Sequence, residues 1–294
     1  MDRQRVIKAF QKYTGHYNPE DGKIKLKIEH TYRVAALCER IAKSLGMSGE
    51  DVDLAWLCGM LHDIGRFEQI RNYQTFADAD SIDHAHYGIW VLFGTKAVLE
   101  MFATGEEQTQ RELEQELHQF EVSGRGDCTW IEEGRLGKFM DGDFFEEWSH
   151  ILANAIWNHS AYRIKEGLDE RTERFCHILR DADKIDILKV NHDIPLEVIY
   201  GVSNEVLKNE TVTEAVMEQY REQHAILRST KKTCVDHVVG HIALVFELVY
   251  DESIKVVKEQ GYLEKLFDFR SDNRKTREQF KELKERMTSY IENR

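Results

Sequence analysis

Apolar side chains recur along most of the chain at the three- and four-residue spacing of amphipathic helices, and no alternating run of Val, Ile and Thr indicates a sheet. One helix is expected from about Lys25 to Leu45, because its apolar positions share one face. The residues expected on that inward face are His30, Val34, Leu37, Ile41 and Leu45. Only two prolines occur in the chain, so the pattern predicts an all-α protein.

A second helix is expected to begin at Ser48–Asp51, which resembles a capping box, and to continue to about Ile64. Between Leu54 and Leu61 this helix is apolar on nearly every side, which predicts a central, buried position. Gly65 is expected to end it.

The rest of the chain is also expected to be helical, apart from one polar segment. Further helices are predicted from near Asp83, over Phe145–Asn158 and Glu170–Val190, and, after Pro195, near Asn204–Gln219, Cys234–Tyr250, Ile254–Glu259 and Arg274–Glu292. Residues 104–142 are rich in Glu, Gln and Gly and are interpreted as an inserted arm. We therefore expect a core over residues 1–202 with an insertion at about 104–142, and a C-terminal helical extension over 203–294 packed on that core.

The composition narrows the classes of function. A formal net charge of -13 argues against a protein that coats nucleic acid or an anionic membrane, although a bound metal would still allow a small anionic substrate. The five cysteines form no Cys-x-x-Cys pattern, and the N-terminal residues lead into no apolar stretch. The longest apolar run, Leu54–Leu61, is far shorter than the roughly 20 residues that cross a bilayer. These features predict a cytoplasmic protein outside the membrane.

Several metal-binding side chains lie at the ends of the expected buried faces. They are His30, the adjacent pair His62 and Asp63, His159 and Asp183. Burying an imidazole or a carboxylate is costly unless it is paired or bound to a metal. One such histidine alone is more often a core residue, and one such aspartate more often a capping group. Together, on different helices, they predict convergence on a metal, and their chemistry suits Fe, Mn, Zn, Co or Ni.

Three segments resemble the HD domain superfamily of metal-dependent phosphohydrolases. The segments are His30–Ala35, Leu61–Arg66 and Asp181–Asp186, and they follow the family order of His, then His-Asp, then a distal Asp. The resemblance covers roughly Lys25 to Tyr200 and implies an HD-domain helical bundle. It also implies that the first metal is held by His30, His62, Asp63 and Asp183. Asp183 is preferred to Asp181 because the distal Asp precedes a basic residue in many members of the family.

Some HD proteins hold a second metal, and the resemblance extends partly to that site. His84 and Gly88 match a His-x-x-x-Gly segment, and His159 matches a later segment in which binuclear members often have two adjacent histidines. Asn158 precedes His159 in this chain, so the sequence does not decide whether the site binds one ion or two. His86 is expected to point away from His84, since the two lie about 200° apart around a helix.

The resemblance implies hydrolysis of a phosphoester. A bound cation polarises a phosphoryl oxygen and lowers the pKa of its water. Asp63 could bridge two ions or orient the water, and with a single ion His84 or His159 could act as the general acid. Arg66, Lys184 and Arg33 are candidate phosphate-binding cations, the alternative being ordinary surface cations. The predicted substrate is a nucleotide or another small phosphoester, and the reaction is that of a phosphomonoesterase or a phosphodiesterase.

Two other functions stay open, a regulatory ligand-binding HD module and an HD-type di-iron oxygenase. The complete ligand set favours the enzyme over the regulatory module. His237 and His241 also have the spacing of metal ligands on a helix, but their neighbours are apolar and no zincin-type Glu is present, so they are interpreted as structural. Neither the substrate nor the oligomeric state follows from the sequence.

Overall fold

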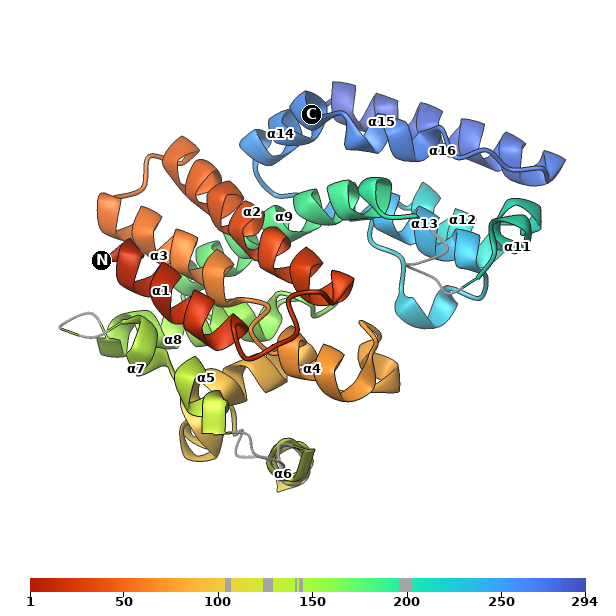
Figure 1. Cartoon of the computed structure of the whole chain (residues 1–294). Coiled ribbons are helices and arrows are strands. Elements are labelled where there is room, and N and C mark those ends of the chain that lie inside the picture. Colours follow the sequence, from red (N-terminus) through yellow and green to blue (C-terminus); the bar gives the residue numbers. More distant parts are fainter. Residues whose placement is uncertain (104–106, 124–128, 141, 143–144, 196–201) are drawn as a thin grey trace. The chain divides into compact units, whose positions relative to one another are not determined.

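The computed structural model describes the whole chain except residues 104–106, 124–128, 141, 143–144 and 196–201 (Figure 1). The described residues form helices and turns and no strand, which confirms the predicted all-α fold. They divide into two compact units, Met1–Leu179 and Arg180–Arg294. The division falls inside α9 (Glu170–Asp193), ahead of the boundary expected at residues 202–203. Parts of the predicted insertion lie outside the described residues.

The first unit holds the helices that carry most of the candidate site. Its elements are α1 (Arg3–Thr14), α2 (Gly22–Ser44), α3 (Gly49–Leu61), α4 (Arg66–Tyr73), the 3₁₀ turn η1 (Asp78–Asp80), α5 (His84–Phe102), α6 (Glu107–Ser123), η2 (Thr129–Gly134), α7 (Leu136–Phe139) and α8 (Phe145–Asn158). α3 packs between α2 and α8, and α5 packs against α8, α6 and α4. The predicted central position of the second apolar helix is therefore observed for α3.

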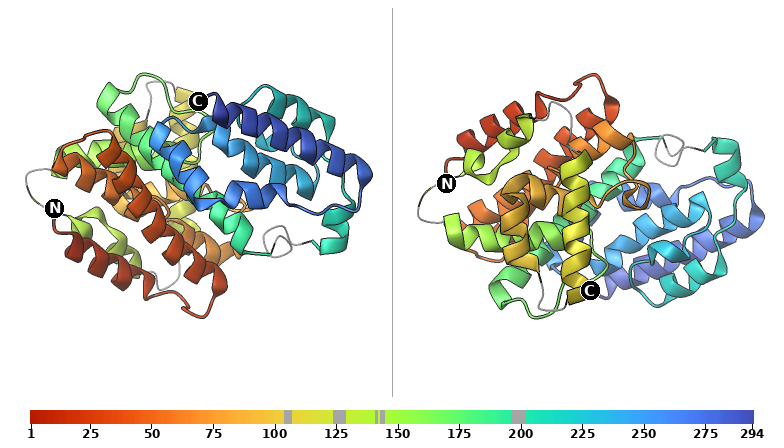
Figure 2. Two further views of the ribbon diagram at one scale, coloured as in Figure 1. Left: turned by 90° about the horizontal axis from the view of Figure 1, so that it is seen from above. Right: turned by 90° about the horizontal axis from the view of Figure 1, so that it is seen from below.

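The second unit consists of shorter helices and one long one. Its elements after α9 are α11 (Asn204–Asn209), α12 (Glu214–Arg221), η3 (Arg228–Thr230), α13 (Cys234–Ile242), η4 (Ala243–Glu247), α14 (Asp251–Gln260), α15 (Tyr262–Phe267) and α16 (Arg274–Glu292). α16, dark blue in Figure 2, packs against α12 and α15. No helix among the described residues is long and apolar enough to cross a bilayer.

Glycine allows α2 and α3 to touch along their backbones. A Cβ added at Gly59 of α3 would lie 2.5 Å from the Cα of Ala35 in α2. A real side chain would push the two helices apart, so this contact depends on glycine. Because His30 lies on α2 and His62 directly follows α3, the close packing brings these two imidazoles together.

A second close approach joins the turn after α3 to the start of α5. A Cβ added at Gly65 would lie 2.3 Å from the carbonyl oxygen of His84 and 2.6 Å from the backbone nitrogen of Gly88. Both neighbours are backbone atoms, which move only with their helix. Gly65, which was expected to end the second helix, instead directly precedes α4, and it sets how near the first turn of α5 lies to Asp63.

Replacing Gly65 by alanine should destabilise the protein by about 3 kcal/mol, since the new methyl group would overlap backbone atoms of α5. Urea unfolding followed by circular dichroism measures the effect. Gly49→Ala is the matched control, because a Cβ at this helical position meets no atom within 4 Å. That control should change stability by no more than about 1 kcal/mol, in the stabilising direction. Equal stability of the two variants would contradict the close contact.

Several helix boundaries differ from the sequence expectations. α1 was not predicted, and the apolar helix ends at Leu61 instead of Ile64, where four turn residues lead into the unpredicted α4. The expected helix over 204–219 is two helices, and the one over 234–250 changes to a 3₁₀ turn after Ile242. α5 is kinked at Gly94, whose φ of 78° is strained for any side chain other than glycine.

Candidate metal centre

Four histidines and one aspartate meet inside the first unit. His30 comes from α2, His62 and Asp63 from the turn that follows α3, His84 from the first position of α5, and His159 from the position after α8. None of the five is more than 4% exposed. Burying four imidazoles around a carboxylate costs more free energy than a hydrophobic core can offset, unless a cation is bound between them.

The two carboxylate oxygens of Asp63 face different pairs of histidines. Oδ2 lies 3.4 Å from Nε2 of both His30 and His62, and these two nitrogens are 3.2 Å apart. Oδ1 lies 3.5 Å from Nε2 of His84 and 3.8 Å from Nε2 of His159, and these nitrogens are 3.0 Å apart. Ligands at 2.0–2.1 Å around one tetrahedral ion are roughly 3.3 Å from each other. Each oxygen of Asp63, together with its two imidazole nitrogens, therefore has roughly the spacing of three ligands around one metal ion.

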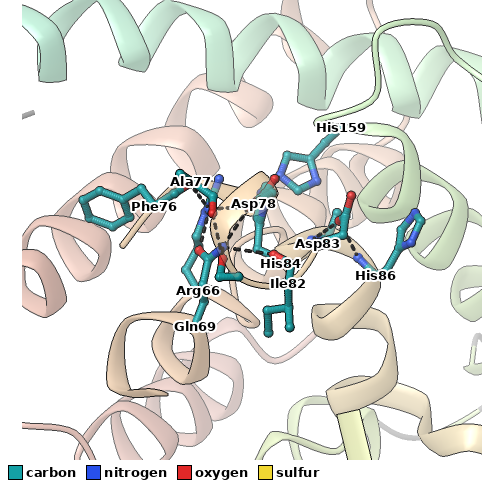
Figure 3. A network of polar contacts seen from close by, with 12 residues as sticks. Arg66, Gln69, Phe76, Ala77, Asp78, Ile82, Asp83, His84, His86 and His159 are labelled. Atoms are coloured by element: carbon teal, nitrogen blue, oxygen red, sulfur yellow. Dashed lines mark hydrogen bonds and ion pairs between the residues drawn. The ribbon is translucent and has the colours of Figure 1, made fainter. Parts of the chain in front are cut away.

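Hydrogen bonds fix the tautomers of three of these rings. Nδ1 of His62 donates to the carbonyl of Gly59 at 2.8 Å, and Nδ1 of His159 donates to the carbonyl of Ile156 at 2.6 Å. Nδ1 of His84 lies 2.9 Å from both carboxylate oxygens of Asp78. Both side chains are labelled in Figure 3. Because these oxygens only accept, each Nδ1 carries a hydrogen, and the Nε2 lone pair of each neutral ring is directed into the centre.

The close contact between His84 and His159 fits a metal ion better than a proton. With hydrogens on both Nδ1 atoms, a hydrogen bond between the two Nε2 atoms would require one ring to be an imidazolium. Burial, together with the nearby charge of Arg66, lowers the pKa of His84 and opposes this. A divalent cation accepts both lone pairs at once. The residues present therefore suit a divalent transition metal.

Cations surround the central carboxylate. Lys27 donates to Oδ2 of Asp63 at 2.6 Å, and Nε of Arg66 lies 3.6 Å from Oδ1. Burial alone would raise the pKa of Asp63, but the charge of Lys27 and the neighbouring His62 and Arg66 hold it well below its usual value. Asp63 is therefore ionised and able to bind metal across the physiological pH range.

Neither Lys27 nor Asp78 was predicted from the sequence to belong to the site. Lys27 precedes His30 by three residues and so shares its helix face, a spacing that could have identified it. Asp78 lies on the connection between α4 and α5 and has no sequence signal of this kind. Asp78 and Asp83 could form a third metal-binding group with His84. Asp78 already pairs with Arg66 and His84, however, and Asp83 caps α5, so both carboxylates have other roles.

Arg66 is held more tightly than a free phosphate-binding cation. Its Nη1 donates to Oε1 of Gln69 at 2.5 Å, to the carbonyl of Phe76 at 2.8 Å and to Asp78 at 2.8 Å (Figure 3). Its Nε is buried and has no hydrogen-bond partner among the described residues. Arg33 instead lies 3.8 Å from Glu29 on its own helix.

Two predicted site residues, Asp183 and Lys184, belong to the second unit. Asp183 is half-buried on α9, and its place as a metal ligand stays a prediction. Lys184 is buried beside Arg180, and burial together with that charge lowers its pKa to about 8. Asp181 accepts hydrogen bonds from the backbone N–H groups of Val249 and Tyr250, which precede α14, and from the hydroxyl of Ser253, so its partners lie within this unit.

The remaining histidines lie apart from the centre. His86 points away from His84, pairs with Glu116 at 3.0 Å and stacks on Trp157, as expected from its position on the helix. His237 and His241 lie on α13 in the second unit, and neither belongs to a metal-binding group found among the described residues. Burial next to Lys231 lowers the pKa of His241 to about 3, so it is neutral at physiological pH.

Comparison with known proteins relates part of the chain to a known domain family. Residues 28–125 match the family model of the HD domain, a range that contains His30, His62, Asp63 and His84. The first unit is thus an all-α unit with a buried group of side chains that could hold a metal ion. Residues 28–125 therefore match an HD domain, the family that the motifs in this part of the chain indicated.

One curated relative is similar over a short stretch. A protein of Vibrio cholerae described as "3'3'-cGAMP-specific phosphodiesterase 1" is 39% identical over 49 residues. The similarity covers 17% of this chain and only 11% of that relative. No solved structure matches significantly.

Proposed function

We propose that this chain is a metal-dependent phosphohydrolase that acts on a nucleotide or another small phosphoester. The observation that carries the proposal is the buried Asp63 carboxylate with one pair of imidazole nitrogens on each side. His30 and His62 would hold one divalent ion, His84 and His159 a second, and Asp63 would bridge them. Ions bound there would supply polarisation of a phosphoryl oxygen and a lowered pKa of the attacking water.

The chain's own residues would bind and orient the substrate. Lys27 is 15% exposed at its side chain and lies over the ring of Phe76, 5.5 Å from the centroid. Its ammonium group can shift from Asp63 to a substrate phosphate once metal neutralises the carboxylate. The buried Nε–H of Arg66 can donate to a phosphoryl oxygen, while its Nη1 contacts keep the side chain in place. The proposed role of Lys184 is likewise to neutralise phosphate.

The short similarity to a phosphodiesterase supports a phosphodiester substrate, and cyclic dinucleotides are therefore among the candidates to test. The same pairing of imidazoles about one carboxylate also suits two iron ions, which keeps an oxygenase as a second candidate. These two functions differ in one measurable requirement, since only an oxygenase consumes dioxygen.

A metal-resolved substrate screen tests the proposal. Purified protein is analysed for bound metal, stripped with a chelator and reloaded separately with Mn, Fe, Co, Ni or Zn. Each form is assayed with p-nitrophenyl phosphate, bis-p-nitrophenyl phosphate, nucleoside mono- and triphosphates, and linear and cyclic dinucleotides including 3'3'-cGAMP. Metal-restored hydrolysis that is unchanged without oxygen supports a phosphohydrolase. Fully metallated protein that hydrolyses none of these compounds would reject it, and oxygen-dependent turnover of the iron form would support the oxygenase.

A further inference from the structure

One acidic side chain outside the group of expected ligands connects three residues around the metal centre. Asp78 lies on η1, in the connection between α4 and α5. Its carboxylate accepts hydrogen bonds from Nδ1 of His84 at 2.9 Å, Nη1 of Arg66 at 2.8 Å and Nε2 of Gln69 at 2.9 Å. Figure 3 shows these side chains converging on Asp78. The carboxylate is thus held from two sides while it contacts the imidazole.

His84 needs this partner because of its place in the helix. His62 and His159 each donate Nδ1–H to a backbone carbonyl three residues earlier, in the last turn of the preceding helix. His84 is the first residue of α5, so no turn of its own helix precedes it. A side chain from the connecting segment must therefore supply the acceptor, and Asp78 does so.

The charge of Asp78 also matters. Oδ1 of Asp78 lies 2.8 Å from Nη1 of Arg66, and this buried ion pair favours the ionised form of the carboxyl group. An ionised carboxylate behind a metal-binding histidine orients the ring, fixes its tautomer and makes the other nitrogen a stronger donor. Arg66 keeps this buried negative charge balanced.

We propose that Asp78, held by Arg66 and Gln69, is the positioning residue that fixes His84 with its Nε2 lone pair toward the metal centre. Arg66 then has a structural part in the site besides the phosphate contact suggested above. The inference rests on the proposed metal centre, but the tautomer of His84 can be measured without metal, substrate or turnover.

Histidine tautomers in the metal-free protein provide the first test. Long-range ¹H–¹⁵N correlation spectra distinguish an Nδ1–H ring from an Nε2–H ring, and the absence of one signal set in His84→Gln assigns His84. The wild-type ring should be in the Nδ1–H form. In Asp78→Leu it should shift toward a mixture or toward the Nε2–H form. An unchanged tautomer in a folded Asp78→Leu protein would overturn the proposal, whether or not the chain is a phosphohydrolase.

Metal affinity provides the second test, using Co²⁺ as the probe and calorimetry with visible absorption as the readout. Asp78→Asn should weaken Co²⁺ binding at one of the two sites about 10- to 100-fold and leave the other unchanged. Asp78→Glu should restore part of the loss, since it keeps the charge but moves it. Asp80→Asn is the matched control, because Asp80 is an exposed carboxylate on the same turn. Equal affinity in Asp78→Asn and Asp80→Asn would overturn the proposal.

Discussion

Replacing Asp63 by alanine should remove metal from the protein and lower phosphohydrolase turnover by about 10⁴-fold or more, since both the ion and the water it activates are lost. Among the residues that the structure describes, Asp63 is the carboxylate that both imidazole pairs share. Its loss would also leave Lys27 partly buried without its carboxylate partner. Elemental analysis of the purified variant and single-substrate kinetics on the best substrate from the screen measure the two effects.

His237→Ala is the control for this experiment, because it removes a histidine with ligand-like spacing from a different unit. It should retain full metal content and turnover. Circular dichroism of both variants checks that each is folded. A folded Asp63→Ala protein with near-normal metal and rate would show that the centre lies elsewhere. Loss of metal in folded His237→Ala would show that the metal ligands had been assigned to the wrong group of residues.

The double replacement of His84 and His159 by alanine should have the next largest effect. If each side of Asp63 holds an ion, the variant should bind one metal instead of two and keep the ion at His30 and His62. If the centre holds a single ion, metal content should stay the same and the rate should fall by roughly 10²–10⁴-fold, because a general acid is lost. Metal stoichiometry and the rate on the same substrate distinguish the two cases.

His86→Ala serves as the comparison for this pair, since His86 lies two residues from His84 but stacks on Trp157 and pairs with Glu116. Its removal should leave metal stoichiometry unchanged. If the His84 and His159 double variant retains full metal and full rate, these two histidines are structural and the site is smaller than proposed.

The HD motif could be predicted from the sequence because each part of its pattern lies within a single helix or turn. His62 and Asp63 follow a continuous apolar turn, and His30 begins an apolar face of fixed helical period, so both signals lie within one element. The all-α class followed from the same periodicity. α1 could also have been found, because Val6, Phe10 and Tyr13 share a helical face and Asp2 caps the helix.

Only the tertiary structure decided how distant side chains combine around Asp63. His84 and His159 are 75 positions apart, and their contact depends on how the turn after α3 packs against α5, a distance set by Gly65. Asp78 lies in a connecting segment that has no helical period of apolar residues, so its hydrogen bond to His84 could not be predicted from the sequence pattern. Helical period records which face of a helix is buried, but it does not record which group from another helix meets that face. For that physical reason the sequence by itself determined the all-α class and the HD motif, and the fold decided the pairing of the histidines and the partners of Arg66.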